Sequence, residues 1–169
     1  MPLPETGWIE FLGVALLAVL LFTVATGIFY SLISLYWSRI DRVIHRPALA
    51  VQLGMLTVLA AHSAVVWLYA LTYWSMAEWL ELGNLAGMHE SGELLGYVYF
   101  SVTTYSSLGF GDVFPLGPMR LLTGVEAIHG LIMIAWSATY TYIATEKYIS
   151  HRKKAWGSEM ALKERLKDD

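Results

Sequence analysis

Three long apolar runs constrain this chain more than any other feature. Residues 9–37 contain a single charge, Glu10, residues 48–77 contain none, and residues 121–145 contain only Glu126. Each run exceeds the roughly 20 apolar residues that a helix needs to cross a bilayer. The first run has no basic residue before it and no convincing cleavage site, which argues against a signal peptide. We therefore expect an integral, multi-pass membrane protein with three retained transmembrane helices.

The composition excludes several other classes of protein. Of the 169 residues, 56% are hydrophobic and 15% are charged, whereas ordinary globular domains have about 25% charged residues. The net charge of -3 and the lack of a long basic run argue against nucleic acid as a partner. The absence of cysteine excludes disulfides and thiolate metal sites. No two histidines have metal-ligand spacing, and no cofactor is expected.

The charges between the apolar runs predict the orientation of the chain. Basic residues follow the first and third runs, and acidic residues flank the other ends. The basic residues are Arg39, Arg42, His45, Arg46, Lys147, Arg152, Lys153 and Lys154, and the acidic ones are Glu5, Glu10, Glu78, Glu81, Glu90 and Glu93. Basic loops stay in the cytoplasm. We therefore expect the N-terminus and residues 81–118 outside and the C-terminus in the cytosol, in the lipids of a plasma or inner membrane.

A fourth apolar segment, residues 93–105, is too short to span. As a helix it would measure about 20 Å, against a hydrocarbon core of about 30 Å. The glycine-rich stretch Ser-Leu-Gly-Phe-Gly-Asp follows it at residues 107–112. Non-helical backbone at membrane depth is tolerated only where it is buried in protein or lines a wet cavity. We expect a re-entrant hairpin, with a pore helix at 93–105 and a filter loop at 107–112.

The alternate glycines Gly109 and Gly111 suggest what this loop does. Glycine permits left-handed conformations, which turn successive carbonyls the same way. Four such strands around an axis would stack rings of carbonyl oxygens that can replace the hydration shell of a potassium ion. The partly negative C-terminal end of the short helix would point at that cation. A plain glycine turn between two helices is the alternative.

A spanning helix, a short apolar helix, a glycine-rich loop and a second spanning helix follow one another in this chain. In this order they resemble the pore module of the potassium-channel superfamily. The filter of that family is usually Thr-Val-Gly-Tyr-Gly-Asp. It is matched position for position by Ser107, Leu108, Gly109, Phe110, Gly111 and Asp112. The serine keeps the hydroxyl that lines the innermost ion site but lacks the methyl group of threonine. The departures at Ser107 and Leu108 bear on how strict the selectivity is.

The resemblance implies an all-α membrane fold that assembles as a homotetramer around permeant potassium ions. The resemblance is to the prokaryotic type of these channels, which has two transmembrane helices and a pore loop, with an extra N-terminal helix in this chain. The pore module would cover residues 48–146, with the outer helix at 48–80 and the inner helix at 119–146. Residues 1–47 would hold the extra helix and a basic cytosolic loop. The charged residues 147–169 would form a cytosolic tail, either as a short bundle or disordered.

The resemblance also assigns roles to single residues. Tyr99 would brace Asp112 at the filter exit, and Thr103 stands where some members carry a glutamate. Gly130, ten residues after Arg120, occupies the usual hinge position, although close helix packing explains a glycine there equally well. The expected cavity-lining residues are Leu131, Ile134, Ala138 and Tyr142. Periodicity alone would equally allow these four to face lipid.

Three further polar residues lie within the predicted spans. Glu126 should lie behind the filter and accept hydrogen bonds from the pore loop, with a gating protonation site as the alternative. We expect His129 to be buried and hydrogen-bonded rather than a pH sensor, and His62 to pack in the second helix. The extra first helix should pack outside the pore module. Its candidate contact residues are Gly13, Ala18, Thr26 and Gly27.

Three functions are compatible with these features to different degrees. The first is a potassium-selective channel, and the second is a weakly selective monovalent cation channel on the same scaffold. The third is a small membrane enzyme or haem protein that uses His62, His129 and Glu126. This third reading leaves the filter-like stretch unexplained. We therefore expect a channel and not an enzyme.

Overall fold

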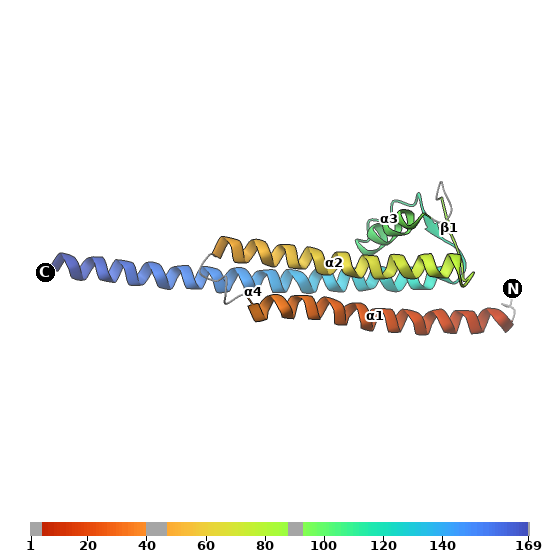
Figure 1. Ribbon diagram of the computed structural model, residues 1–169, viewed down its shortest axis with the longest axis horizontal. Coiled ribbons are helices and arrows are strands. Elements are labelled where there is room, and N and C mark those ends of the chain that lie inside the picture. The colour runs from red at the N-terminus through yellow and green to blue at the C-terminus, as the bar shows by residue number, and fades with distance from the viewer. Residues whose placement is uncertain (1–4, 40–46, 88–92, 169) are drawn as a thin grey trace.

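The computed structural model describes residues 5–39, 47–87 and 93–168. Four helices and two very short strands follow one another along the chain (Figure 1). The helices are α1 (Glu5–Arg39), α2 (Pro47–Glu78), α3 (Leu94–Tyr105) and α4 (Met119–Asp168). The strands are β1 (Leu85–Ala86), before α3, and β2 (Phe114–Pro115), after it. Arg42, His45 and Arg46 of the basic loop, and Glu90 of the acidic flank, lie outside the described residues.

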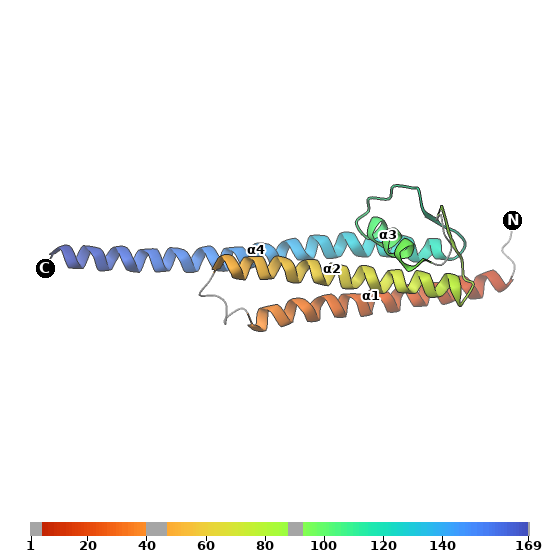
Figure 2. The ribbon, with the colours of Figure 1, turned by 45° about the horizontal axis from the view of Figure 1, so that its top comes forward.

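Three helices lie side by side and are long enough to cross a membrane. Their apolar segments are Gly7–Arg39, Ala48–Glu78 and Met119–Ile143. Successive helices run in opposite directions, so that the N-terminal end of α1 lies at the same end of the molecule as α3 (Figure 2). The C-terminal end of α4 lies at the opposite end. This confirms the all-α membrane fold with three spanning helices that the apolar runs predicted.

Helix α3 is the short helix of the hairpin. It has 12 residues, which gives a length of about 18 Å. It packs against α2 and α4, near one end of the bundle (Figure 1). A helix of this length cannot cross the hydrocarbon core, and α2 ends and α4 begins at the same end of the bundle, near α3 (Figure 1).

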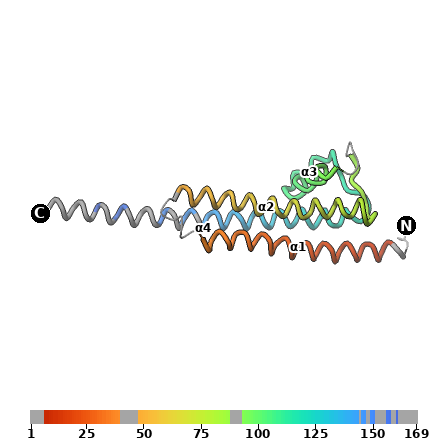
Figure 3. Tube along the Cα trace, viewed as in Figure 1, coloured from red at the N-terminus to blue at the C-terminus, as the bar shows by residue number. Residues whose placement is uncertain are grey.

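Helix α1 packs along α2 and α4 (Figure 3). Its buried side chains recur every three or four residues and form one stripe. They are Val14, Ala18, Leu21, Ala25, Phe29 and Ile33. The opposite face is also apolar but exposed, as in a helix whose other side meets lipid. Of the four contact residues expected in α1, Ala18 and Thr26 meet other helices. Gly13 and Gly27 are exposed in the single chain, and no other described helix contacts them there.

A two-residue antiparallel pair ties the segment before α3 to the segment after the filter. Leu85 is opposite Pro115, and Ala86 is opposite Phe114. Next to this pair, Gly87 has a φ of 91°, and a Cβ there would lie 1.9 Å from the carbonyl oxygen of Asp112. Only glycine allows this approach in this backbone conformation. The chain before α3 is therefore held directly against the filter exit.

The inner helix continues beyond its expected end. Helix α4 has 50 residues and includes the tail, for which we expected either a short bundle or disorder. The last part of this helix extends past the ends of α1 and α2 (Figure 1). The tail thus begins as a direct continuation of the membrane-spanning helix.

Candidate functional site

The filter strand alternates between two backbone conformations. Ser107, Gly109 and Gly111 have φ values of 57°, 50° and 81°. The intervening residues, Leu108 and Phe110, are not in the left-handed region. The left-handed conformation of Gly109 and Gly111 is the one that the sequence predicted for the two glycines. The alternation also includes Ser107, for which a left-handed conformation costs about 1–2 kcal/mol, and no sequence signal predicted that.

The last turn of α3 binds the start of the filter strand through its backbone. The carbonyl of Thr103 accepts hydrogen bonds from the amides of Leu108 and Gly109, at 2.9 and 3.0 Å. The Thr103 hydroxyl donates to the Phe100 carbonyl within the helix, at 2.9 Å. Where some relatives carry a glutamate, this chain therefore holds the strand by a backbone carbonyl rather than by a carboxylate.

The other side of the strand is open in the single chain. Leu108 and Phe110 are 59% and 65% exposed. Among the described residues, no atom outside the adjoining chain lies within 4 Å of a Cβ built on Gly109 or Gly111. Irregular backbone at membrane depth needs either protein or water around it. Within the described residues this side of the strand has no such protein around it, so either water or another protein surface must meet it.

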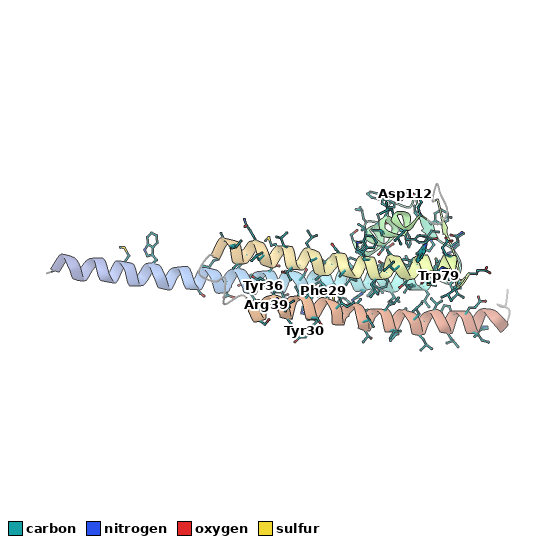
Figure 4. All side chains as sticks on the ribbon, viewed as in Figure 1. Phe29, Tyr30, Tyr36, Arg39, Trp79 and Asp112 are labelled. Carbon is teal, nitrogen blue, oxygen red and sulfur yellow. The ribbon has the colours of Figure 1, made fainter. Side chains whose placement is uncertain are left out.

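Asp112 ends the filter strand, at the outer edge of the molecule above α3 (Figure 4). The Tyr99 hydroxyl donates to Asp112 Oδ2 at 2.7 Å, which is the contact expected from the resemblance. The Val113 amide donates to Oδ1 at 3.0 Å. The hydrogen bond from Tyr99 is the main cause that lowers the pKa of Asp112, and the same bond raises the pKa of Tyr99. Asp112 is therefore held as a carboxylate facing solvent.

Tyr99→Phe tests this brace, because it removes the donor but keeps the ring. We expect the conducting filter to close several-fold faster. Without the hydrogen bond, the pKa of Asp112 should rise toward its ordinary value. Since the carboxylate exists only above that pKa, the external pH at which conduction is lost should move upward. Single-channel recordings at a series of external pH values measure both effects.

Tyr97→Phe is the matched control for this variant. It removes another tyrosine hydroxyl from α3, but that hydroxyl donates to Glu78 of α2, at 3.3 Å, and not to the filter. Closing in Tyr97→Phe should follow the wild type. Wild-type closing in Tyr99→Phe, together with fast closing in Asp112→Asn, would show that another group braces Asp112.

Glu126 is fully buried and joins three helices. Its Oε1 lies 2.5 Å from Ser101 Oγ of α3, and its Oε2 accepts from the Tyr73 hydroxyl of α2 at 2.6 Å. The bond to the pore helix is the one that the sequence led us to expect, and the bond to the outer helix was not predicted. Both oxygens of the buried acid are thus hydrogen-bonded, as burial requires. Glu126 fixes α3 between the outer and inner helices.

The two histidines are hydrogen-bonded between helices and do not converge on a common site. His129 is buried, as expected, and lies between Thr26 of α1 and Tyr69 of α2. His62 contacts Tyr105 and Ser137 through its two ring nitrogens. Among the described residues, no group of three histidine, aspartate or glutamate side chains could hold a metal ion. The geometry gives no support to a haem or metal centre built on His62, His129 and Glu126.

Gly130 lies within the continuous helix α4, where the end of the pore helix touches it. A Cβ at this position would lie 1.8 Å from the carbonyl oxygen of Tyr105. Close packing thus accounts for this glycine without a hinge. The four expected cavity-lining residues follow on the same helix: Leu131, Ile134 and Tyr142 are large exposed hydrophobic residues, and Ala138 is exposed as well.

A short helix and a filter-like strand, inserted between two spanning helices, define the pore-loop class of membrane channels. The chain belongs to the ion channel family, whose model matches residues 55–147 and describes a two-transmembrane pore of the potassium-channel type. The match covers α3, the filter strand and most of α2, and it leaves out α1. Searches of curated proteins and of solved structures gave no match. Proteins of this family are channels rather than enzymes and need no cofactor.

Proposed function

We propose that the protein is a potassium-selective channel formed by four copies of this chain. The observation that carries the proposal is the alternation of left-handed residues at Ser107, Gly109 and Gly111. Such an alternation supports the proposal because it would let successive carbonyls face the same side of the strand, where they could replace the hydration shell of a potassium ion. The carbonyls of residues 107–111 would bind the ions, and Tyr99, Asp112 and Glu126 would support the strand. Potassium would be the permeant ion and not a resident cofactor.

The open side of the strand supports the tetramer. One chain contributes one strand, and four strands close a ring of carbonyls around an axis. The exposed Leu108 and Phe110 would then be covered by neighbouring copies. On this arrangement, Leu131, Ile134, Ala138 and Tyr142 would line the cavity below the filter.

The direction of the helices supports the proposed orientation in a cell membrane. The filter exit and the beginning of α1 lie at one end of the bundle, and the C-terminal part of α4 lies at the other (Figure 2). Arg39 is at the end of α1 that faces away from the filter exit. With basic residues on the cytosolic side, the N-terminus and the filter exit would face outward.

A bi-ionic reversal potential of the purified protein in planar bilayers tests the proposal. With potassium on one side and sodium on the other, a tenfold preference shifts the reversal potential by about 59 mV. We expect a shift larger than this toward the potassium potential. A wild-type reversal potential near zero would contradict the proposal and favour a weakly selective cation channel.

Ser107→Ala serves as a second arm of the same experiment. It removes a hydroxyl but leaves every backbone carbonyl in place. Internal block by barium should weaken, because the innermost ion site loses its hydroxyl, while the preference for potassium should remain. Loss of the preference in Ser107→Ala would mean that the carbonyl rings do not decide selectivity.

A further inference from the structure

We propose that His62 is a positioning residue, which sets the end of the pore helix relative to the inner helix and thereby sets the start of the filter strand. The proposal rests on the proposed conduction function. His62 belongs to α2, its Nδ1 lies 2.9 Å from the Tyr105 hydroxyl, and its Nε2 lies 3.1 Å from Ser137 Oγ. One imidazole thus bridges the last residue of α3 and the inner helix α4.

The hydrogen bonds of Ser137 determine the direction of this bridge. The Ser137 hydroxyl donates its single proton to the Ile134 carbonyl, at 2.9 Å. It can therefore only accept from His62, whose proton must be on Nε2. The other nitrogen, Nδ1, then has a free lone pair and accepts from the Tyr105 hydroxyl. All the polar atoms of the bridge are satisfied when His62 is neutral with the proton on Nε2.

Tyr105 is held at both of its ends. Its side chain is bound by His62, and its carbonyl carbon and oxygen abut Gly130 of α4. The rings of His62 and Tyr105 also meet edge to face, with centroids 5.7 Å apart. Only two residues further on, Ser107 begins the filter strand in its left-handed conformation. A shift of the Tyr105 side chain would therefore be passed to the first carbonyl of the filter.

The bridge also has a packed support from α1. The ring of Phe29 meets His62 edge to face, with centroids 5.0 Å apart. Phe29 is buried and points from α1 toward the other two long helices (Figure 4). The imidazole is therefore fixed by two hydrogen bonds and two aromatic contacts, a geometry that suits a spacer rather than a mobile side chain.

His129 provides an internal control because it repeats the same bonding pattern in another place. The Thr26 hydroxyl donates to Phe22 at 2.7 Å and so can only accept from His129 Nε2, at 3.2 Å. The Tyr69 hydroxyl then donates to Nδ1 at 3.1 Å. This bridge joins α4 to α1 and α2, and its hydrogen bonds do not reach the pore helix. The ring of His129 does meet the ring of Tyr105 edge to face, with centroids 6.3 Å apart. The two histidines therefore differ in that only His62 makes a hydrogen bond to the pore helix.

Two variants of His62 each remove one of its two hydrogen bonds and keep the other. The side-chain oxygen of Asn reaches about as far as Nδ1 and can still accept from Tyr105, but Asn loses Ser137. The amide of Gln reaches about as far as Nε2 and can still donate to Ser137, but Gln loses the acceptor near Tyr105. Tyr105→Phe removes the same bond from the other side and keeps the aromatic packing.

The experiment compares filter closing in low external potassium, and the bi-ionic reversal potential, for His62→Gln, His62→Asn, Tyr105→Phe and His129→Gln. We expect His62→Gln and Tyr105→Phe each to speed filter closing about fivefold, the effect of one net hydrogen bond of about 1 kcal/mol. The double variant that combines His62→Gln with Tyr105→Phe should close its filter no faster than either single variant, because the two substitutions remove the same hydrogen bond. The rate of filter closing in His62→Asn should stay near that of the wild type, because the hydrogen bond to Tyr105 is kept. His129→Gln should lower the thermal unfolding temperature and, because it removes a ring contact with Tyr105 but no hydrogen bond to it, should speed filter closing less than His62→Gln does.

Wild-type closing in Tyr105→Phe, or additive effects in the double variant, would overturn the role of His62. Equal effects of His62→Gln and His129→Gln would do the same, because they would indicate general packing. Failure of the proposed function has a different signature, namely a wild-type channel that does not prefer potassium. The closing rates of the variants, each taken relative to the wild type, still decide the role of His62 in that case.

Discussion

Gly130→Ala should prevent the pore helix from seating against α4 and should abolish conduction. The added Cβ would lie 1.8 Å from the Tyr105 carbonyl oxygen and 2.7 Å from its carbonyl carbon. These are backbone atoms at the end of a packed helix, so the clash cannot be relieved by a side-chain rotation. Overpacking typically costs about 1–3 kcal/mol, and every copy in an assembly would bear this cost. Thermal unfolding in detergent and macroscopic potassium flux measure the two effects.

Gly124→Ala is the matched control, six residues earlier on the same helix. Apart from its chain neighbours and the backbone of its own helix, no atom of the described residues lies within 4 Å of a Cβ at Gly124. This variant should fold and conduct, since alanine favours a helix by about 1 kcal/mol over glycine. If Gly130→Ala kept wild-type stability and merely opened less often, a hinge rather than close packing would explain the glycine.

Gly111→Ala should leave a folded assembly that carries no potassium current. Gly111 has a φ of 81°, and a residue with a Cβ in a left-handed conformation costs about 1–2 kcal/mol. Four copies would raise the cost to about 4–8 kcal/mol in the assembled filter, enough to move the strand out of its alternating conformation. Native mass spectrometry would establish assembly, and flux into vesicles would establish conduction.

Gly117→Ala carries a similar backbone penalty outside the filter. Its φ is 62°, and a Cβ there would make only an ordinary contact, 3.6 Å from Gly83 Cα. We expect a modest loss of stability and a normal current. Potassium current in Gly111→Ala equal to that in Gly117→Ala would show that the strand conformation does not govern conduction.

The three spanning helices could be predicted from sequence, but their contact faces could not. In α1, both the buried stripe that contains Val14 and Phe29 and the exposed side that contains Leu16 are apolar. Lipid and protein interiors are equally apolar, so hydropathy cannot separate the two sides of such a helix. Of the small residues expected to make helix contacts, Ala18 is buried between helices, whereas Gly13 is exposed in the single chain.

At the candidate site, the resemblance to a family predicted one hydrogen bond, and the hydrogen bonds made by His62 were not predicted. The Tyr99–Asp112 hydrogen bond came from the resemblance. The bridge made by His62 joins residues 43 and 75 positions away, and neither motif nor periodicity links such partners. The pairing of β1 with β2 was missed as well, because two-residue strands are too short to show an alternating pattern.

The length of α4 has a mechanical consequence. From the contact at Gly130, about 20 Å of helix leads to Ile143, and about 57 Å leads to the last described residue, Asp168. For a rigid rod tilting about that contact, displacement grows in proportion to distance. The far end would therefore travel about three times as far as the end of the spanning segment. An optical or spin label near Trp156 would magnify small rotations of the membrane-spanning part of α4, which makes the far end of this helix a natural reporter of motion within the helix bundle.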